Sequence, residues 1–251
     1  DPTNDIINQF SEYYNYAIHR AVTGPSFEKS FLEVKGDSEL HARFYVSASG
    51  SSGTLAAGDY LKDHFNTKIA VVEATECPTL LYNGYGEHNI QGIGDKHVPL
   101  IHNVMNTDFV VGVSDQATNN LNLIFNTDIG QNYLKSKKGL ADNFIKCLPE
   151  FGLSSIANII ASIKLAKYMN LNSQDAIITV ATDGADLYLT ELEKTKKEFP
   201  GTYDETSCAE MYGQYLKGIT TDHILELNQK EKERIFNLGY YTWVEQQGVD
   251  L

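Results

Sequence analysis

The stretch "SASGSSGTLAAGDYL", residues 47–61, decides the fold. It places Gly, Ser and Thr between the strand-like run "RFYVSA" (43–48) and a helical pattern that extends to Phe65. At such a junction several backbone N–H groups have no helical partner, and the helix dipole adds partial positive charge. The glycines let the backbone approach a ligand closely, and the hydroxyls offer further hydrogen bonds. The junction therefore predicts a cup for a phosphate or a similar anion, formed by Gly50, Ser51, Ser52, Gly53 and Thr54.

The motif of this cup is not a common one. It does not match GxGxxG, and it does not match the GxxxxGK[ST] loop because no Lys follows it. A plain connection between strand and helix is therefore the alternative interpretation. Its position favours a ligand, because ligands bind at the carboxyl ends of strands in open α/β sheets. Three other junctions, at residues 80–99, 150–155 and 180–189, carry Gly, Ser, Thr or Asp at the same edge. Together they predict one site.

Three more apolar runs predict buried strands. They are "KIAVVEA" (68–74), "FVVGV" (109–113) and "AIITVA" (176–181). None alternates cleanly between apolar and polar residues, which is typical of strands that are covered on both faces. Helical patterns separate the strands, at residues 54–65, 114–125 and 154–169, and a Tyr-rich helix is expected over residues 6–21. This order predicts a three-layer α/β fold with a mostly parallel sheet and helices on both faces.

The C-terminal part of the chain is richer in charged residues than the rest. Charged runs such as "NQKEKERIF" predict solvent-facing helices, so we expect an α/β domain over residues 1–198 and a helical C-terminal tail over residues 199–251. The tail carries an aromatic cluster that either packs onto the domain or forms a subunit interface. Its members are Phe236, Tyr240, Tyr241 and Trp243.

Composition excludes several classes of function. The formal net charge of −13 disfavours general binding to nucleic acid or to an anionic membrane. No apolar run reaches the roughly 18 residues that a membrane span needs. The cysteines Cys77, Cys147 and Cys208 form no CxxC motif, which favours a reducing, cytoplasmic location. The histidines are scattered, so we expect no metal site.

Six blocks of the sequence resemble the pyridoxal-phosphate enzymes of the cysteine synthase and tryptophan synthase β family (fold type II). They follow the family's order and span roughly residues 6–190. The blocks are "NQF…H…TGP" (8–25), "GSSGTLAAGDYLK" (50–62), "EHNIQGIGDKHVP" (87–99), "VVGVSDQA" (110–117), "GLSSIANIIASIKLAK" (152–167) and "VATDGADLYLT" (180–190). The resemblance implies a tryptophan synthase β-like fold and pyridoxal 5'-phosphate as cofactor.

The resemblance also implies roles for individual residues. Residues 50–54 hold the cofactor phosphate, and the Thr182 hydroxyl hydrogen-bonds the pyridine nitrogen. A neutral hydroxyl leaves that nitrogen largely unprotonated, which suits elimination and replacement at the β-carbon better than transamination. Gln9 matches a residue that helps to hold the substrate carboxylate, although the block that follows it, "SEYYNYA", departs from the family's pattern.

The family's Schiff-base Lys finds no match in this chain, and neither does its Ser/Thr-Gly-Asn loop. In the family, both lie ahead of the block that contains Gln9, whereas Lys62, Lys164 and Lys167 lie on predicted helices. The resemblance therefore implies the C-terminal, cofactor-phosphate-binding part of such an enzyme, with no catalytic residue of its own. We expect this part to be inactive alone and to need the missing N-terminal half or a complementary chain, in a homodimer or hetero-oligomer.

The function that follows is that of a lyase, synthase or thiolase acting on a small amino acid. The block "RIFNLGYYTWVEQQGV" (234–249) is similar to the β subunit of 2-amino-4-oxopentanoate thiolase, which would imply coenzyme A and a second subunit. Two alternatives stay open. One is a non-catalytic domain that binds a phosphate ligand or another subunit. The other is a nucleotide-binding α/β domain in which Glu73 or Glu76 binds ribose.

Overall fold

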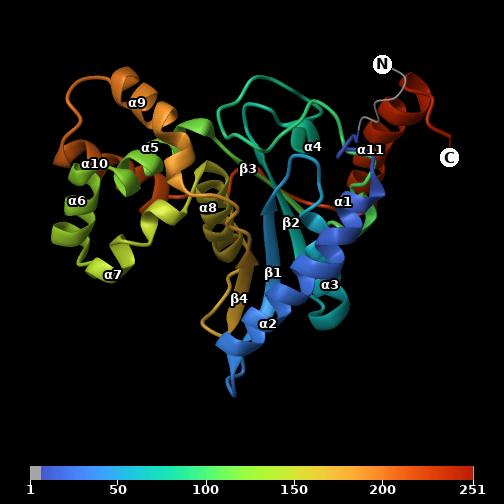
Figure 1. The fold of residues 1–251 in the computed structure, drawn as a ribbon, viewed down its shortest axis with the longest axis horizontal. Helices are drawn as coiled ribbons and strands as arrows, with labels where there is room; N and C mark the ends of the chain where they lie inside the picture. Colours follow the sequence, from blue (N-terminus) through green and yellow to red (C-terminus); the bar gives the residue numbers. More distant parts are fainter. Residues whose placement is uncertain (1–6, 251) are drawn as a thin grey trace.

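The computed structural model describes residues 7–250 and has a five-stranded sheet at its centre (Figure 1). The strand order is β4-β1-β2-β3-β5, and all neighbouring pairs are parallel except β3 and β5. The predicted α/β architecture is confirmed. The strands are β1 (His41–Ala48), β2 (Lys68–Ala74), β3 (Phe109–Val113), β4 (Asp175–Thr179) and β5 (Ile224–Glu226).

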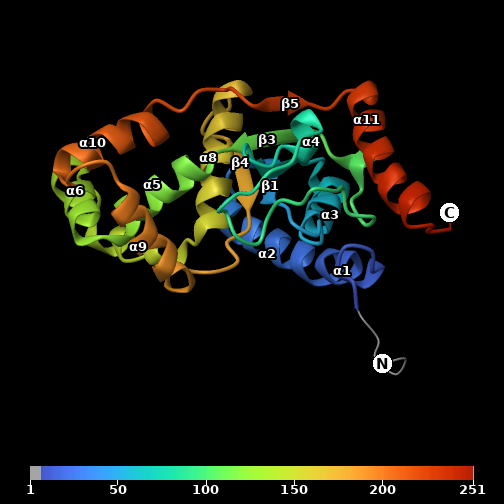
Figure 2. The same ribbon diagram turned by 90° about the horizontal axis from the view of Figure 1, so that it is seen from above.

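Helices cover both faces of this sheet, as Figures 1 and 2 show. The helices before β4 are α1 (Tyr13–Ile18), the π-helical η1 (His19–Thr23), α2 (Gly24–Lys35), α3 (Leu55–Phe65), α4 (Thr79–Tyr82), η2 (Val104–Asn106), α5 (Asp115–Asn126), α6 (Asp128–Lys138), α7 (Asp142–Ile145), η3 (Leu148–Glu150) and α8 (Leu153–Tyr168). Those after it are η4 (Ala185–Tyr188), α9 (Leu189–Glu198), α10 (Glu205–Tyr212), η5 (Gly213–Lys217), α11 (Gln229–Tyr240) and η6 (Tyr241–Gln246).

Successive residues of the central strands enter cores on opposite faces of the sheet. Phe44 and Val46 of β1 pack with α5 and α8, whereas Tyr45, between them, packs with Leu61 of α3. Because side chains alternate across a strand, a strand covered on both faces must be apolar at every position. Val110 of β3 is likewise fully buried on the α3 side. The two cores explain why these runs lack alternation.

The strand β4 departs from its prediction. All five of its residues are half-buried rather than buried, because β4 is an edge strand of the sheet within residues 7–250. The sequence contains the apolar residues Ala176, Ile177 and Ile178 in this strand. The expectation of burial on both faces is therefore wrong for β4, although its placement next to β1 agrees with the parallel sheet.

The N-terminal helix also differs from its prediction. Ile6 lies outside the described residues, and the helix begins at Tyr13, not near residue 6. The Asn8 carbonyl accepts from the N–H groups of Ser11 and Glu12, while its side chain accepts from the Phe10 N–H. Asn thus supplies the backbone with a turn that competes with a helix. The predicted helix ends at residue 21, but the chain continues through η1 into α2. Pro25 does not interrupt this continuation, because it lies in the first turn of α2, where no backbone N–H is needed.

The C-terminal tail is mostly helical but also contributes β5. This strand pairs antiparallel with β3, in the register Val110↔Leu225. In the aromatic cluster of the tail, Trp243 is buried and donates from Nε1 to the Val98 carbonyl at 2.8 Å. Phe236 and Tyr241 remain exposed. The tail is therefore anchored to the sheet and to the loop that precedes η2.

Among the described residues no single helix is long and apolar enough to cross a membrane, although the bent pair Asp142–Glu150 and Leu153–Tyr168 passes that test jointly.

Glu73 on β2 makes the stability of this fold depend on pH. Its buried carboxylate accepts from the N–H groups of Leu80 and Leu81 at 2.9 and 2.8 Å. Burial raises the pKa of Glu73 from 4.5 to about 7, so the native state binds this proton more tightly than the unfolded chain does. The stabilising contribution is thus complete below pH about 4.5 and is lost as the pH rises through about 7.

Replacing Glu73 with Gln is expected to remove that dependence. The wild-type free energy of unfolding should fall by about 2–3 kcal/mol between pH 5 and 7.5 relative to that of the Glu73→Gln variant. Urea titrations at several pH values would measure the difference. The exposed Glu226→Gln variant is the control, and parallel curves for the wild type and Glu73→Gln would contradict the assignment.

Candidate functional site

The predicted cup connects the end of β1 to the start of α3. Two pairs of hydroxyls fix its shape: Ser49 Oγ lies 3.1 Å from Ser52 Oγ, and Ser47 Oγ lies 2.8 Å from Thr54 Oγ1. Ser52 has a φ of 69° and is buried. A non-glycine residue in the left-handed region is uncommon and is retained only where the surroundings hold it. The turn is therefore a rigid, bent segment.

The cup presents a row of free donors. No acceptor within residues 7–250 lies in hydrogen-bond range of the backbone N–H groups of residues 50–54. The first N–H donor after them is that of Leu55, which pairs with the Ser52 carbonyl at 3.2 Å. These five groups stand at the N-terminus of an 11-residue helix, where the dipole adds positive charge. Such an arrangement binds a phosphate or a carboxylate.

Close packing behind the cup explains its glycines. A Cβ added to Gly50 would lie 2.8 Å from the carbonyl oxygen of Gly92, and one added to Gly53 would overlap the Asn15 side chain. Asn15 Nδ2 donates to Ser51 Oγ at 2.9 Å, so α1 supports the cup from outside. Larger residues at 50 or 53 would displace these neighbours.

Thr182 faces the cup across one cavity of about 130 Å³. The structure thus brings together the five cup residues and Thr182, which are about 130 residues apart in the sequence. Thr182 Oγ1 lies 3.3 Å from Ser154 Oγ, at the start of α8. The cavity is lined by His19, Ala48, Gly50, Ser51, Ser52, Gly53, Thr54, Gln91, Gly92, Ile93, Ser154, Asn158, Val180, Thr182 and Asp183.

The position of this cavity follows from the topology. The strands β1 and β4 are neighbours, but α3 follows β1 on one face while α8, which precedes β4, packs on the other. The crevice between two such strands, at their carboxyl ends, is where open α/β sheets bind ligands. Asn158 of α8 holds this crevice together, since its Oδ1 accepts from the Ala48 N–H at 2.7 Å and its Nδ2 donates to the Val180 carbonyl at 2.9 Å.

Gln9 does not line the cavity. Its side chain is exposed, and its backbone carbonyl accepts from Asn15 Nδ2 at 2.9 Å. The same Asn15 amide contacts Ser51, so Gln9 lies near the cup without facing into it. Among residues 7–250, its position does not place the Gln9 side chain at the predicted site.

Three further residues of the cavity carry chemistry that the site prediction did not include. His19 lies in the π-helical turn, where its Nδ1 is 2.9 Å from Thr23 Oγ1, and burial lowers its pKa. Asp183 is bonded to the Tyr188 hydroxyl through Oδ2, while its buried Oδ1 has no partner within residues 7–250. Asn158 could have been found, because it is a polar residue within the apolar run of a buried helix and must pair there.

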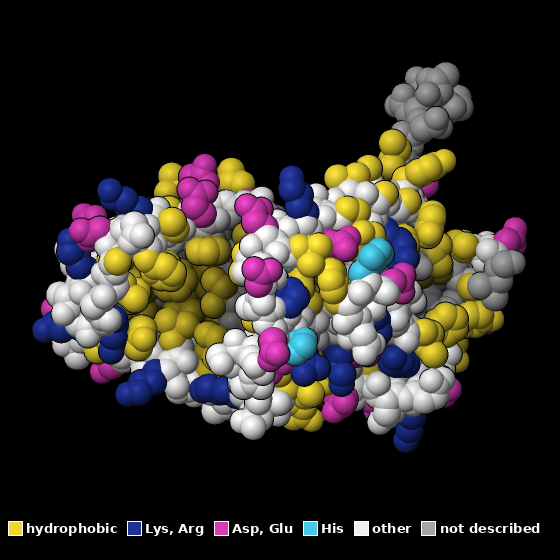
Figure 3. Space-filling view, turned by 90° about the horizontal axis from the view of Figure 1, so that it is seen from below, with side chains coloured by type: hydrophobic (Ala, Val, Ile, Leu, Met, Phe, Trp, Pro, Cys, Tyr) yellow, Lys and Arg dark blue, Asp and Glu magenta, His cyan; other side chains and the backbone are white. Residues whose placement is uncertain are grey.

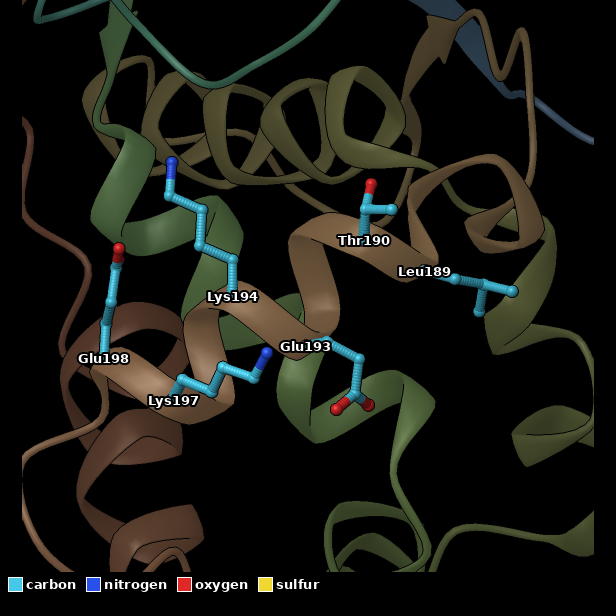
Figure 4. Close-up of a pocket in the computed structure, with 6 residues that line it drawn as sticks. All are labelled: Leu189, Thr190, Glu193, Lys194, Lys197 and Glu198. Carbon is cyan, nitrogen blue, oxygen red and sulfur yellow. The ribbon is translucent and has the colours of Figure 1, made fainter.

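A larger cavity, of about 570 Å³, lies along α9 and is not a convincing site. All its lining residues come from that one helix, and Figure 4 shows their side chains pointing in different directions. Binding sites instead have polar groups that converge on one point. No group of three His, Cys, Asp or Glu residues in the described part of the chain could hold a metal ion.

Comparison with known proteins gives a consistent picture. No family model matches the chain. Cysteine synthase B of Campylobacter jejuni is 29% identical over 191 residues, which are 75% of this chain and 54% of that protein. Cysteine synthase 3 of Caenorhabditis elegans is 29% identical over 192 residues, covering 75% and 49%. The chain spans about half the length of the curated relatives it matches.

Solved structures agree on the fold. The hydrogen sulfide-producing enzyme of Fusobacterium nucleatum aligns with a TM-score of 0.57 and 24% identity, over 87% of this chain and 57% of that one. O-acetylserine sulfhydrylase isoform 3 of Entamoeba histolytica aligns with a TM-score of 0.58 and 23% identity, over 81% and 53%. In sequence this chain is similar to cysteine synthases, and its fold is that of the cysteine synthase-like, fold type II pyridoxal-phosphate enzymes.

Proposed function

We propose that this chain binds the phosphate of pyridoxal 5'-phosphate in its cup and forms part of an enzyme that acts on a small amino acid. The five free N–H donors belong to residues that line the same cavity as Thr182, and this arrangement carries the proposal. The donor set fits the group, because backbone N–H groups at a helix N-terminus satisfy phosphate oxygens without a neighbouring Lys or Arg. The cavity lining indeed contains neither of these residues.

Each residue of the site has a separate task in this proposal. The cup fixes the phosphate, the Thr182 hydroxyl meets the ring nitrogen, and Asn158 keeps these two parts at a constant separation. The cofactor, when bound, supplies an electron sink for the substrate's α-carbon. Because Thr182 is neutral, it does not favour a protonated ring nitrogen, which suits β-replacement or β-elimination.

The amine that this cofactor needs would come from outside the chain. No lysine among residues 7–250 lines the cavity, so the assembled enzyme would take its Schiff-base Lys from a preceding segment or a complementary chain. The strand β4 is a half-buried edge strand within residues 7–250, which favours an additional segment beside it. Figure 3 shows a separate hydrophobic hollow at the α5–α10 end, on the face seen from below.

The names of the curated relatives favour β-replacement over the thiolase alternative. Both sequence relatives described above are cysteine synthases, and they match three quarters of this chain. The thiolase interpretation rests on the single block at residues 234–249 and would require coenzyme A and a second subunit. We therefore propose replacement at the β-carbon of a small amino acid as the reaction, with thiolytic C–C cleavage as the second candidate.

The nucleotide-binding alternative loses its key residues. Glu73 is buried and already accepts two backbone N–H groups. Glu76 accepts from the Asp115 N–H at 3.1 Å and from the Thr75 hydroxyl at 3.1 Å. Both carboxylates are therefore already engaged by donors of the protein itself.

Replacing Thr182 with Asp is expected to change the electronic state of the bound cofactor. A carboxylate at this position favours a protonated ring nitrogen, so the visible absorption spectrum should shift and transamination should gain relative to elimination. Absorption spectra and product ratios of the assembled enzyme would measure both effects. The Thr182→Ser variant keeps the hydroxyl and should behave as the wild type, whereas an unchanged Thr182→Asp spectrum would contradict the role.

The proposal is tested on protein purified from its own source and reduced with borohydride, which fixes the cofactor covalently to lysine. The intact mass should show a cofactor adduct on a species heavier than 28.0 kDa, or on a second chain that co-purifies with this one. A single 28.0 kDa species without any adduct would contradict the enzyme and favour the alternative of a binding-only domain.

A further inference from the structure

A second cavity, of about 310 Å³, lies at the carboxyl end of β3 on the face of the sheet that α8 covers. It shares no lining residue with the cup cavity. Figure 2 shows the segment between α10 and β5 running past α8 toward β3, and this segment closes one side of the cavity. Its wall includes Thr75, Val113, Ala117, Ile160, Lys164 and Asp222.

A buried lysine forms part of the wall. The side chain of Lys164 is 6% exposed, and its Nζ donates to the Gly112 carbonyl at 2.9 Å. Burial lowers the pKa of this amine, while the neighbouring Asp222 carboxylate opposes the shift. Lysine is rarely buried unless it is paired. An ammonium has three donors, and the carbonyl engages one of them.

The partner of Lys164 is the solvent-exposed Asp222. Asp222 Oδ1 is 3.2 Å from Lys164 Nζ, and the Asp222 side chain is 58% exposed. The Thr220 hydroxyl donates to the same oxygen at 2.6 Å. One cation and one anion therefore stand next to each other at the cavity, one buried and one open to solvent.

A purely structural ion pair would not need this space. The pair could fix the loop before β5 to β3, yet that role leaves a cavity whose wall also contains apolar side chains and hydroxyls. Val113, Ala117 and Ile160 form an apolar surface, and Thr75 adds a hydroxyl. A simple anion would be repelled by Asp222, and a simple cation by Lys164. A ligand that carries both charges, with a small apolar group, complements the wall.

We propose that this second cavity binds a free α-amino acid. Lys164 holds its carboxylate, Asp222 holds its ammonium group, and its side chain lies against Val113, Ala117 and Ile160. The site is separate from the cup and binds its ligand without chemical change. It gives the protein a second position at which an amino acid is recognised.

L-Valine is the probe, measured by calorimetric titration of the full chain. The expected result is saturable binding of L-valine, with isobutylamine and 3-methylbutanoate each weaker by at least about tenfold because each lacks one charge. Neither inorganic phosphate nor pyridoxal phosphate should displace it. Displacement by phosphate would place the probe in the cup and overturn the proposal, as would equal binding of the singly charged analogues or no binding of L-valine.

Two variants locate the site. Lys164→Met and Asp222→Asn should each weaken L-valine binding roughly tenfold, while Ser51→Glu in the cup should leave it unchanged. Asp222 is exposed and Asn keeps an oxygen that can accept from Lys164 Nζ, so this replacement disturbs the fold less than that of the buried Lys164. Unaltered binding by the Asp222→Asn variant would overturn the assignment.

Discussion

Replacing Ser51 with Glu is expected to weaken the binding of pyridoxal phosphate roughly 100-fold while leaving the melting temperature nearly unchanged. The residue lies among the five free N–H donors, so a carboxylate there repels the phosphate and occupies its space. The fold should tolerate the change, because Ser51 is half-buried and its only side-chain hydrogen bond within residues 7–250 is the one it accepts from Asn15 Nδ2, a role that Glu retains.

Fluorescence titration with pyridoxal phosphate would measure this loss. Ser136→Glu on α6 adds the same charge at an exposed position far along the chain and should keep wild-type affinity. A variant that loses its melting transition yet keeps its affinity would mean that the cup is structural and that the phosphate binds elsewhere.

The second large effect is expected at Asn158. Replacement by Leu removes both hydrogen bonds that tie the end of β1 to the segment after β4. The Ala48 N–H and the Val180 carbonyl, both in half-buried residues that line the cavity, would lose these partners, and each lost hydrogen bond costs about 0.5–1.5 kcal/mol. We expect the free energy of unfolding to fall by about 2 kcal/mol, and affinity for pyridoxal phosphate to fall with it.

Chemical denaturation would measure the first effect and ligand titration the second. Ser162→Ala, one turn further along α8, removes a hydroxyl that donates to the Asn158 carbonyl and should cost less than about 1 kcal/mol. A stability close to that of the wild type in Asn158→Leu would show that the crevice does not depend on this bridge.

The parts of the fold that could be predicted are those in which a local run of apolar residues indicates a buried strand or helix. The strands at residues 68–74 and 109–113 have the predicted bounds, because each is a run of apolar residues flanked by turn-forming residues. The helix α6 escaped prediction because its sequence, "DIGQNYLKSKK", is largely polar. It is positioned instead by its Thr127 N-cap and by the burial of Tyr133 and Leu134.

The site shows the same division. The cup could be predicted because its function depends on backbone N–H groups, which a short Gly-Ser-Thr run between a strand and a helix exposes. The contributions of Asn15 and His19 could not, since they depend on how the N-terminal helices pack against the cup. The exposed position of Gln9 likewise follows from the turn at Asn8, which composition does not reveal.

The most direct test of the account compares the stabilisation of this chain by pyridoxal phosphate, by pyridoxal and by ATP in thermal unfolding. A ligand that binds only the folded state raises its stability in proportion to RT ln(1 + [L]/Kd). We expect pyridoxal phosphate to raise the melting temperature, whereas pyridoxal, which lacks the phosphate, and ATP should leave it unchanged. Equal stabilisation by pyridoxal, or stabilisation by ATP alone, would contradict a cup that holds the cofactor phosphate.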